Sequence, residues 1–223
     1  MIDQAVLLLA SNSPRRQQLL ALGSWTFRVA AADVDESHRT DESPQNYVIR
    51  LAEAKARAAS RVARGEQIVI GADTTVVDGA QILGKPAGAA EAGRMLKQLR
   101  GHSHKVYTGL AALRLSDGKL VTDLCVTDVP MRTYTDEEID AYVRSRDPLD
   151  KAGAYAIQHA SFDPVESMAG CYASVMGLPL CHLVRTLREL DLASTADVPM
   201  NCQTFLDYQC PVSSAVLRGE QVG

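Results

Sequence analysis

The feature that most constrains the fold is an apolar run at residues 5–10 that passes directly into Ser11-Asn12-Ser13-Pro14-Arg15-Arg16. The run has the length and composition of a buried strand. The letters after it indicate a helix start, because Ser13 can cap the first turn and Pro14 suits the first helical position. We expect this helix to end at Gly23. A buried strand that leads at once into a helix is typical of an α/β chain.

The remaining pattern alternates helices with strands and adds hairpins. Asp78-Gly79 and Asp117-Gly118 are turn dipeptides that close two of these hairpins. The sequence therefore predicts an α/β fold with a mixed sheet flanked by helices. Helices are predicted for residues 43–63, 89–99, 135–145 and 179–190, and strands for residues 27–31, 68–72 with a continuation to 77, 81–83, 104–115 and 120–132.

The pattern divides the chain into a body and a tail. The helix over 43–63 is expected to bury Val48, Leu51, Ala58 and Val62 at helical spacing. After residue 190 the periodicity weakens and prolines interrupt it. We expect residues 1–190 to form the functional domain and residues 191–223 to be an extended tail that packs on that body.

Composition excludes several classes of protein. Lys and Arg number 23 against 27 Asp and Glu, so the net charge of -4 argues against a broad nucleic-acid-binding surface. No apolar stretch reaches the roughly 18 residues of a membrane span, and the start lacks the basic segment of a signal peptide. We therefore expect a cytoplasmic protein without membrane or nucleic-acid partners.

The five cysteines are odd in number, and no two have the short spacing of common zinc sites. Free thiols in a reducing cytoplasm are the favoured interpretation. The alternatives are that Cys202 and Cys210 pair with each other, or that they join Cys171 or Cys181 in a thiol cluster.

Residues 11–16 form a candidate phosphate site. They lie at a helix N-terminus, where unpaired backbone N–H groups and the positive end of the helix dipole favour an anion. Ser11 and Ser13 add hydroxyl groups, and Arg15 and Arg16 add guanidinium groups that can grip phosphate oxygens. The alternative is a capped helix with two solvated arginines.

Three charged residues suggest a catalytic centre. Lys55 falls on the predicted buried face of its helix, so its ammonium either meets an anionic partner or reaches water along a packed stem. Asp73 ends a buried strand, where a carboxylate can hold a divalent cation or deprotonate a water. Glu36 follows another strand and would add a metal-binding carboxylate, or else belongs to a solvated acidic loop.

Two loops add further candidates. Lys85, in Gly84-Lys85-Pro86, follows a short strand, and Lys151 lies in a loop that leads to Gln158. The Gln158 amide both donates and accepts hydrogen bonds, as the recognition of a base edge requires. The alternative for both segments is an ordinary surface loop.

Taken in order, these segments resemble the Maf family of nucleoside triphosphate pyrophosphatases over roughly residues 5–190. Several motifs in one order carry the resemblance. They are Ala10-Ser11-Asn12-Ser13-Pro14-Arg15-Arg16-Gln17-Gln18-Leu19-Leu20, Gly71-Ala72-Asp73-Thr74, Gly84-Lys85-Pro86, Asp150-Lys151-Ala152-Gly153, Ile157-Gln158 and Gly177-Leu178-Pro179-Leu180.

The resemblance implies an elongated Maf/ITPase-like α/β fold with two lobes around a nucleotide cleft, often as a homodimer. It implies hydrolysis of a nucleoside triphosphate to the monophosphate and pyrophosphate with a divalent cation, Mg²⁺ or Mn²⁺. Asp73 matches the aspartate assigned as proton acceptor, and Glu36 would share the metal. Arg16, Lys55, Lys85 and Lys151 would hold phosphates.

The resemblance also bears on the substrate. Arg15, Thr74 and Gln158 match the selectivity positions of the branch that acts on dTTP and UTP. The sequence departs from the family pattern at His159, over residues 161–166, at Cys171 and in its longer tail. Two alternatives are a pyrophosphatase for a modified nucleotide such as 7-methyl-GTP and a non-catalytic regulator of cell division and septum formation.

Overall fold

The sheet of this protein is long and mixed, and its strands run in the order β2-β1-β3-β5-β6, with β4 paired to β3. The computed structural model describes residues 6–223, so residue 5 of the first predicted strand lies outside the described residues. β1 is parallel to β2 and β3, whereas β4, β5 and β6 are antiparallel to their neighbours. The predicted mixed sheet is confirmed. The strands are β1 (Leu7–Leu9), β2 (Phe27–Val29), β3 (Ile68–Asp78), β4 (Gln81–Leu83), β5 (Ser103–Arg114) and β6 (Leu120–Pro130).

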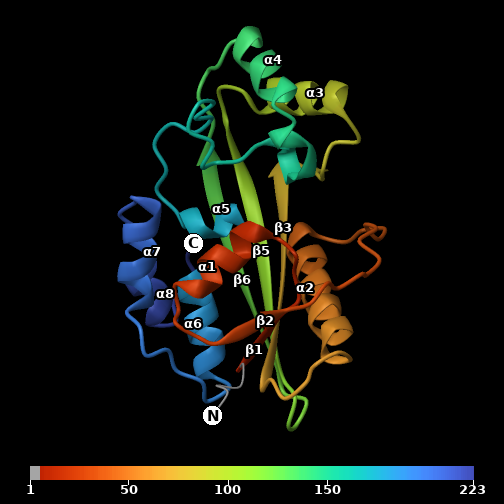
Figure 1. Cartoon of the computed structure of the whole chain (residues 1–223). Coiled ribbons are helices and arrows are strands. Elements are labelled where there is room, and N and C mark those ends of the chain that lie inside the picture. Colours follow the sequence, from red (N-terminus) through yellow and green to blue (C-terminus); the bar gives the residue numbers. More distant parts are fainter. Residues whose placement is uncertain (1–5) are drawn as a thin grey trace.

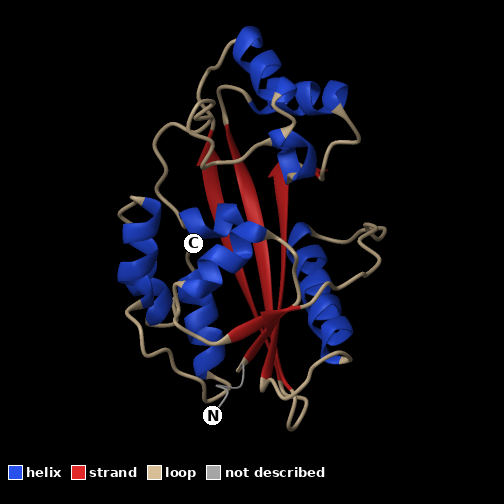
Figure 2. Cartoon of the chain, in the orientation of Figure 1, coloured by secondary structure: helices blue, strands red, loops and turns tan. Residues whose placement is uncertain are grey.

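Helices cover both faces of the sheet and divide the molecule into two lobes. The long strands β3, β5 and β6 extend through both lobes; α3 and α4 lie at one end, and α1, α2 and α6 at the other (Figures 1 and 2). Within residues 6–223 no helix is long and apolar enough to cross a membrane. The helices are α1 (Pro14–Ala21), α2 (Pro44–Ser60), α3 (Ala89–Leu99), α4 (Asp136–Arg144), α5 (Tyr172–Met176), α6 (Leu180–Arg188), α7 (Val198–Leu206) and α8 (Ser213–Leu217), with two short 3₁₀ helices at Asp147–Asp150 and Ala152–Ala154.

Local sequence signals account for where these helices begin. Ser13 and Ser43 accept hydrogen bonds from the backbone N–H three residues on, and a proline follows each cap in the first turn. Thr135 and Glu138 form the predicted capping box at α4. These polar caps fix the ends of the helices next to the strands from which they emerge.

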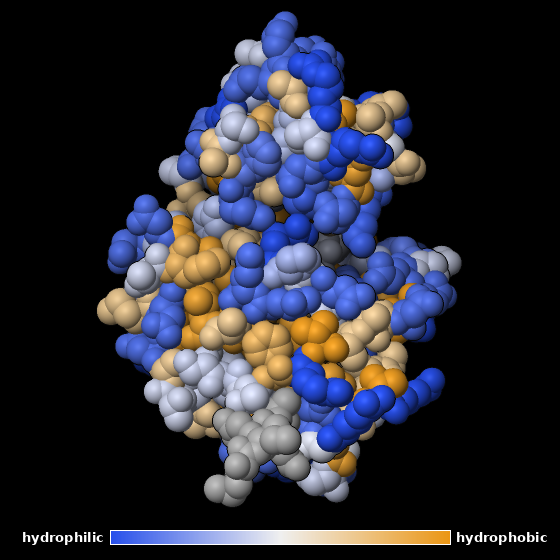
Figure 3. Space-filling view, in the orientation of Figure 1, coloured by the Kyte–Doolittle hydropathy of each residue, from blue (hydrophilic) through white to orange (hydrophobic). Residues whose placement is uncertain are grey.

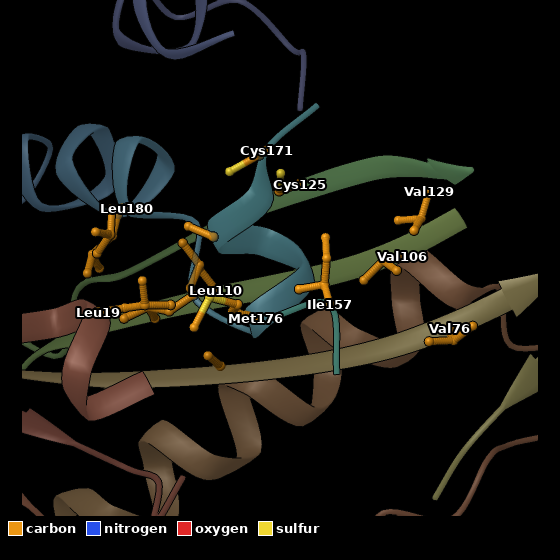
Figure 4. Packing of buried hydrophobic residues seen from close by; sticks show 14 of the residues in the cluster. Leu19, Val76, Val106, Leu110, Cys125, Val129, Ile157, Cys171, Met176 and Leu180 are labelled. Carbon is orange, nitrogen blue, oxygen red and sulfur yellow. The ribbon is translucent and has the colours of Figure 1, made fainter. Parts of the chain in front are cut away.

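One hydrophobic cluster joins the two lobes. It runs from Leu7 and Leu19 near the N-terminus to Leu96 and Tyr134 in the other lobe. Figure 4 shows its middle, where Leu110 and Met176 meet close to α1. The opposite face of the sheet carries a smaller cluster under α2. The lobes therefore share a core.

Two glycines let α2 lie unusually close to the sheet. A Cβ on Gly71 of β3 would be 2.0 Å from the Ala52 carbonyl oxygen, and one on Gly109 of β5 would be 2.6 Å from the Val48 carbonyl oxygen. Both contacts are with helix backbone, which cannot move aside as a side chain would. This close approach brings Lys55 of α2 against Asp73 in the middle of β3.

The buried face of α2 differs in part from the prediction. Val48 and Leu51 are fully buried as expected, but Ala58 is only half-buried and Val62 is 51% exposed, because the helix ends at Ser60. The core stripe instead continues through Ala52, Lys55, Ala56 and Ala59. Lys55 thus lies inside the stripe, and its side chain is only 10% exposed.

The tail after residue 190 is not extended as predicted. It forms α7 and α8, and both pack against α6. Pro199 was interpreted as a helix breaker, yet it lies in the first turn of α7, where no hydrogen bond needs its missing N–H. Asp197 caps that helix through the Met200 N–H. The prediction that the tail packs on the body is correct.

The cysteines are free thiols, as the favoured interpretation predicted. Four of them, two from the body and two from the tail, nevertheless line one small cavity of about 20 Å³ between α5, α6 and α7. Within residues 6–223 no group of three or more His, Cys, Asp or Glu side chains is placed to hold a metal ion. The thiols around this cavity are Cys171, Cys181, Cys202 and Cys210.

We predict that Gly71→Ala lowers the free energy of unfolding by at least about 2 kcal/mol, because its methyl group would push α2 off the sheet. Urea denaturation at neutral pH measures the change. Gly93→Ala in α3 is the matched control: its Cβ meets nothing within 4 Å, and alanine suits a helix interior better than glycine. Equal stability of the two variants would contradict the close packing of α2.

Candidate active site

A cavity of about 660 Å³ opens where the two lobes meet. Figure 3 shows the notch at the waist of the molecule, bordered mainly by hydrophilic residues. A volume of this size accommodates a nucleotide-sized ligand. Every sequence-predicted site residue lines the cavity: Ser11, Ser13, Arg15, Arg16, Glu36, Lys55, Asp73, Thr74, Lys85, Lys151 and Gln158.

A buried lysine links two carboxylates at the base of the cavity. The Lys55 ammonium lies 2.6 Å from Asp73 Oδ1 and 2.7 Å from Glu36 Oε1. Lys55 comes from α2 and Glu36 from the loop before α2. Asp73 lies in the middle of β3, which continues to Asp78, so the prediction that Asp73 ends its strand is wrong. The close approach of α2 at Gly71 makes this contact possible. Lys55 therefore has ionic partners and does not reach into solvent.

The two carboxyl groups differ in their electrostatic surroundings. Burial raises the pKa of Asp73 above its ordinary value, although Lys55 and Arg16 act in the opposite direction. Burial also acts to raise the pKa of Glu36, but the hydrogen bond and charge of Lys55, with Lys85 and Arg16, bring that pKa below its ordinary value. Glu36 is the more exposed of the two, with 48% of its side chain accessible. Burial thus makes Asp73 more basic than an ordinary aspartate, whereas the cations around Glu36 favour its ionised form.

The donor set suits a magnesium-type cation in part. Asp73 and Glu36 both approach the position of the Lys55 ammonium, so their oxygens already surround one cationic centre. Mg²⁺ in phosphate-handling sites takes one or two carboxylates and completes its shell with substrate phosphates and waters. Two carboxylates that line a nucleotide-sized cavity fit that pattern.

The loop before α1 places two hydroxyl groups and a guanidinium at the cavity. Ser11 Oγ accepts hydrogen bonds from the Ser13 N–H and from Arg16 Nη1, while Ser13 caps α1. Within residues 6–223 neither hydroxyl donates a hydrogen bond, so both hydrogens are available to an anion. Ser13 thus caps α1, as one of the two alternatives predicted, and still has a hydroxyl hydrogen available to a ligand.

Arg16 is directed inwards and is held by neutral acceptors. Its Nε donates to the Gly177 carbonyl at 2.8 Å, and its Nη2 donates to Thr74 Oγ1 at 3.2 Å. Burial lowers the pKa of Arg16, with a partly compensating contribution from Asp73. In the described part of the chain no carboxylate lies within ion-pair distance of its guanidinium. A half-buried cation held only by neutral acceptors favours an anionic ligand.

Three other predicted residues line the cavity with side chains that have no partner or only a weak one in the described part of the chain. The Lys85 and Gln158 side chains are exposed and have no hydrogen-bond partner among residues 6–223. Arg15 makes only a loose ion pair with Asp150, at 3.9 Å. These groups can therefore contact a ligand without first breaking strong protein contacts.

Lys151 behaves differently from the prediction. Its ammonium donates to the Asp147 carbonyl at 2.5 Å, to Asp147 Oδ1 at 3.0 Å and to Asp150 Oδ1 at 2.7 Å. An ammonium has three donors, and all three are used within its own loop. Lys151 borders the cavity, but this geometry favours a loop-stabilising role over the phosphate contact that the sequence predicted.

His159, where the sequence departs from the family pattern, stabilises a turn with Phe162. His159 Nδ1 accepts the Phe162 N–H, and its ring packs edge-on against Tyr142 at 4.6 Å between centroids. Phe162 in turn stacks on Tyr142 at 4.2 Å. The unusual segment after Gln158 therefore folds into an aromatic cluster of its own.

Sequence reasoning missed two residues that shape the site. Thr108 on β5 is fully buried, and its hydroxyl contacts Thr74 Oγ1 at 2.9 Å. Tyr47 on α2 lines the cavity and donates to the Glu36 carbonyl. A signal for Thr108 existed, since it interrupts the inward-facing series of Val106 and Leu110 with a polar side chain.

Comparison with known proteins shows which family and which relatives this chain is similar to. The family model described as "Maf-like protein" matches residues 6–190. A protein of Geotalea uraniireducens (strain Rf4) is 45% identical over 184 residues, which cover 82% of this chain and 94% of the relative. A protein of Desulforamulus reducens is 45% identical over 182 residues, covering 82% and 95%. A Bacillus cereus (strain AH187) protein is 43% identical over 189 residues, covering 85% and 97%.

All three relatives are named dTTP/UTP pyrophosphatase. Among solved structures, that of the Staphylococcus aureus Ham1 protein has a TM-score of 0.38 and 14% sequence identity, and the alignment covers 56% of this chain and 71% of that one.

We predict that Lys55→Met destabilises the protein by about 3 kcal/mol at pH 8 and by less at pH 5. Without the ammonium, the pKa of Asp73 rises further above its ordinary value. A raised carboxyl pKa costs stability as pH increases through the folded-state value, so the loss grows with pH. Urea denaturation at several pH values tests this.

Two further variants make the Lys55 test specific. Lys55→Met combined with Asp73→Asn removes both charges and should recover most of the loss at pH 8. Lys105→Met breaks an exposed pair with Asp128, with side chains 49% and 69% accessible, and should cost less than about 1 kcal/mol. A pH-independent loss in Lys55→Met would contradict the buried pair.

Proposed function

The chain belongs to the Maf-like protein family, and we propose that it is a nucleoside triphosphate pyrophosphatase that hydrolyses dTTP and UTP to the monophosphate and pyrophosphate. The observation that carries the proposal is the buried Asp73–Lys55 pair at the base of a nucleotide-sized cavity. A raised carboxyl pKa, a cationic surround and an open cavity are what the activation of a water against a polyanion requires. Relatives at 45% identity named for this activity support it.

The reaction follows from the position of Asp73. Its carboxylate takes a proton from a water, the water oxygen forms a bond to the α-phosphorus, and the bond from that phosphorus to the α–β bridging oxygen breaks. Pyrophosphate leaves with the bridging oxygen, opposite the attacking water. Burial of Asp73 supports this role, because a carboxyl with a raised pKa is the stronger base.

The triphosphate would be held by cationic groups on several sides of Asp73. Lys55 is buried and Arg16 half-buried, and hydrogen bonds hold both in place, whereas Lys85 is exposed and can follow the substrate. Glu36 and Asp73 would hold a divalent cation, Mg²⁺ or Mn²⁺. A bound cation of this kind neutralises part of the phosphate charge.

The nucleoside would lie against the apolar wall on the α5 side. Val76, Val106, Ile157 and Met176 line this part of the cavity and belong to the core (Figure 4). An apolar wall of this kind suits the faces of a base ring. Gln158 lies beyond Ile157, within reach of an edge of the base.

In this proposal residues 1–190 form the catalytic body and residues 191–223 a C-terminal extension. The family match ends at residue 190, and the extension packs on α6. The five free thiols support a location in a reducing cytoplasm. Pairing of two copies into a homodimer and the absence of membrane or nucleic-acid partners stay predictions.

We predict that Asp73→Asn lowers kcat for dTTP by about 10²- to 10⁴-fold, because the amide cannot accept the proton of the water. The substitution keeps the side-chain size, and Lys55 retains Glu36 as a partner, so the fold should persist. Pyrophosphate release measures the activity, and circular dichroism checks the fold.

Asp128→Asn is the matched control for Asp73→Asn, because Asp128 is an exposed strand carboxylate whose side chain is 69% accessible. It should leave pyrophosphate release unchanged. Full turnover in folded Asp73→Asn would remove Asp73 from the mechanism.

A substrate panel separates the proposed function from its alternatives. With Mg²⁺ or Mn²⁺ we expect pyrophosphate release from dTTP and UTP to exceed release from CTP and 7-methyl-GTP, and a chelator to stop it. Preference for 7-methyl-GTP would assign the protein to modified nucleotides. No release from any nucleotide would favour a non-catalytic regulator of cell division.

A further inference from the structure

A chain of hydrogen bonds crosses the wall of the cavity behind Thr74. Arg16 Nη2 donates to Thr74 Oγ1 at 3.2 Å, Thr74 Oγ1 lies 2.9 Å from Thr108 Oγ1, and Thr108 Oγ1 donates to the Ser174 carbonyl at 2.9 Å. The four residues come from α1, β3, β5 and α5. Thr74 and Thr108 are direct partners in the β3–β5 register.

The directions of these bonds are fixed by the number of hydrogens. A threonine hydroxyl has one hydrogen and two lone pairs. Thr108 uses its hydrogen on the Ser174 carbonyl, which can only accept. Thr74 must therefore donate to Thr108, and its first lone pair receives Arg16. What Thr74 has left for the cavity is one lone pair and no hydrogen.

Because Thr74 can only accept a hydrogen bond from a ligand, it can lie only against a part of the nucleotide that donates one. Ionised phosphate oxygens are acceptors only, so they gain nothing from an acceptor and are repelled by it. The hydrogen-bond donors of a nucleoside triphosphate are its ribose hydroxyls and the N–H groups of its base. Thr74 therefore belongs to the nucleoside end of the cavity.

The surroundings of Thr74 point to the base. Thr74 and Val76 lie on the same face of β3, because strand side chains alternate, whereas Asp73 points to the α2 side. A Cβ on Gly177, directly after Met176, would lie 3.4 Å from Thr74 Oγ1. The open lone pair of Thr74 thus adjoins an apolar wall suited to a ring.

We propose that Thr108 is a positioning residue for substrate choice: by taking the only hydrogen of Thr74, it makes Thr74 an obligate acceptor that selects a base with a ring N–H. Uracil and thymine carry a hydrogen on N3, whereas cytosine has a lone pair there. This inference rests on the proposed function and adds the origin of the preference between pyrimidines. It assigns to a buried residue a role outside the catalytic step.

Thr108→Val tests the proposal, because valine keeps the shape and cannot receive the Thr74 hydrogen. Thr74 can then rotate and donate to cytosine N3. We expect the ratio of kcat/KM for UTP to that for CTP to fall by about tenfold or more, the value of one hydrogen bond. Thr108→Ser keeps the hydroxyl and should restore the wild-type ratio. Equal losses for UTP and CTP in Thr108→Val would overturn the proposal, since general damage to the site lowers both.

A second variant keeps the proposal testable if Thr108→Val does not fold. Thr74→Val removes the acceptor itself and lies at a half-buried position, so it too should lower the UTP-to-CTP ratio. Full discrimination in folded Thr74→Val would overturn the inference. If wild-type protein releases no pyrophosphate from any nucleotide, the proposed function fails. An active wild type with an unaltered ratio in the folded variants rejects the role of Thr108 alone.

Discussion

The ion pair between Lys55 and Asp73 is the interaction on which the site depends. Both side chains are only 10% exposed, and each would be costly to bury alone. They meet because α2 lies almost in backbone contact with β3 and β5 at Gly71 and Gly109. A bulkier residue at either glycine would separate the partners. The geometry of the proposed catalytic centre is thus set by the packing distance of a helix on a sheet.

Side chains of β3 point alternately to the two faces of the sheet, so neighbouring residues of this strand contribute to different parts of the cavity. Asp73 points towards α2 and meets Lys55, while Thr74 points towards α1 and α5 and meets Arg16. Neighbouring residues of one strand therefore reach different environments: Asp73 joins the ion pairs of Lys55, whereas Thr74 receives a hydrogen bond from Arg16 and lies beside apolar side chains. A triphosphate with a base at one end matches this division.

Local patterns were sufficient to predict much of this arrangement. The apolar runs, caps and turn dipeptides predicted the main helices and hairpins. A carboxylate directly after the apolar run 68–72 indicated a functional role for Asp73, although the strand does not end there but continues to Asp78. The same reasoning placed Lys55 on a buried helix face but could not name its partners. Those partners are 18 and 19 residues away in sequence and meet Lys55 only through tertiary packing.

Local sequence patterns could not predict the contacts of Lys151 and Thr108 or the helices of the tail. Lys151 carries a charge in a promising motif, but three acceptors of its own loop occupy its ammonium. The bond from Thr108 to Ser174 spans 66 residues and leaves no periodic trace. In the tail, proline breaks helices in general but is tolerated in a first turn. Composition alone did not reveal which case applied.

Two of the departures from the family pattern, Cys171 and the tail, lie next to α5. Cys171 is the residue before α5, and Tyr208 of the tail donates to the carbonyl of Gly170 just ahead of it. Gly223, at the end of the tail, packs against Cys125 next to this segment. Helix α5 carries the Ser174 carbonyl that fixes Thr108, whereas Lys55 and Asp73 lie across β3 on α2. Changes in the tail and at Cys171 therefore act on the α5 side of the cavity, where we propose that the nucleoside binds, and the Lys55–Asp73 pair is held by contacts that they do not touch.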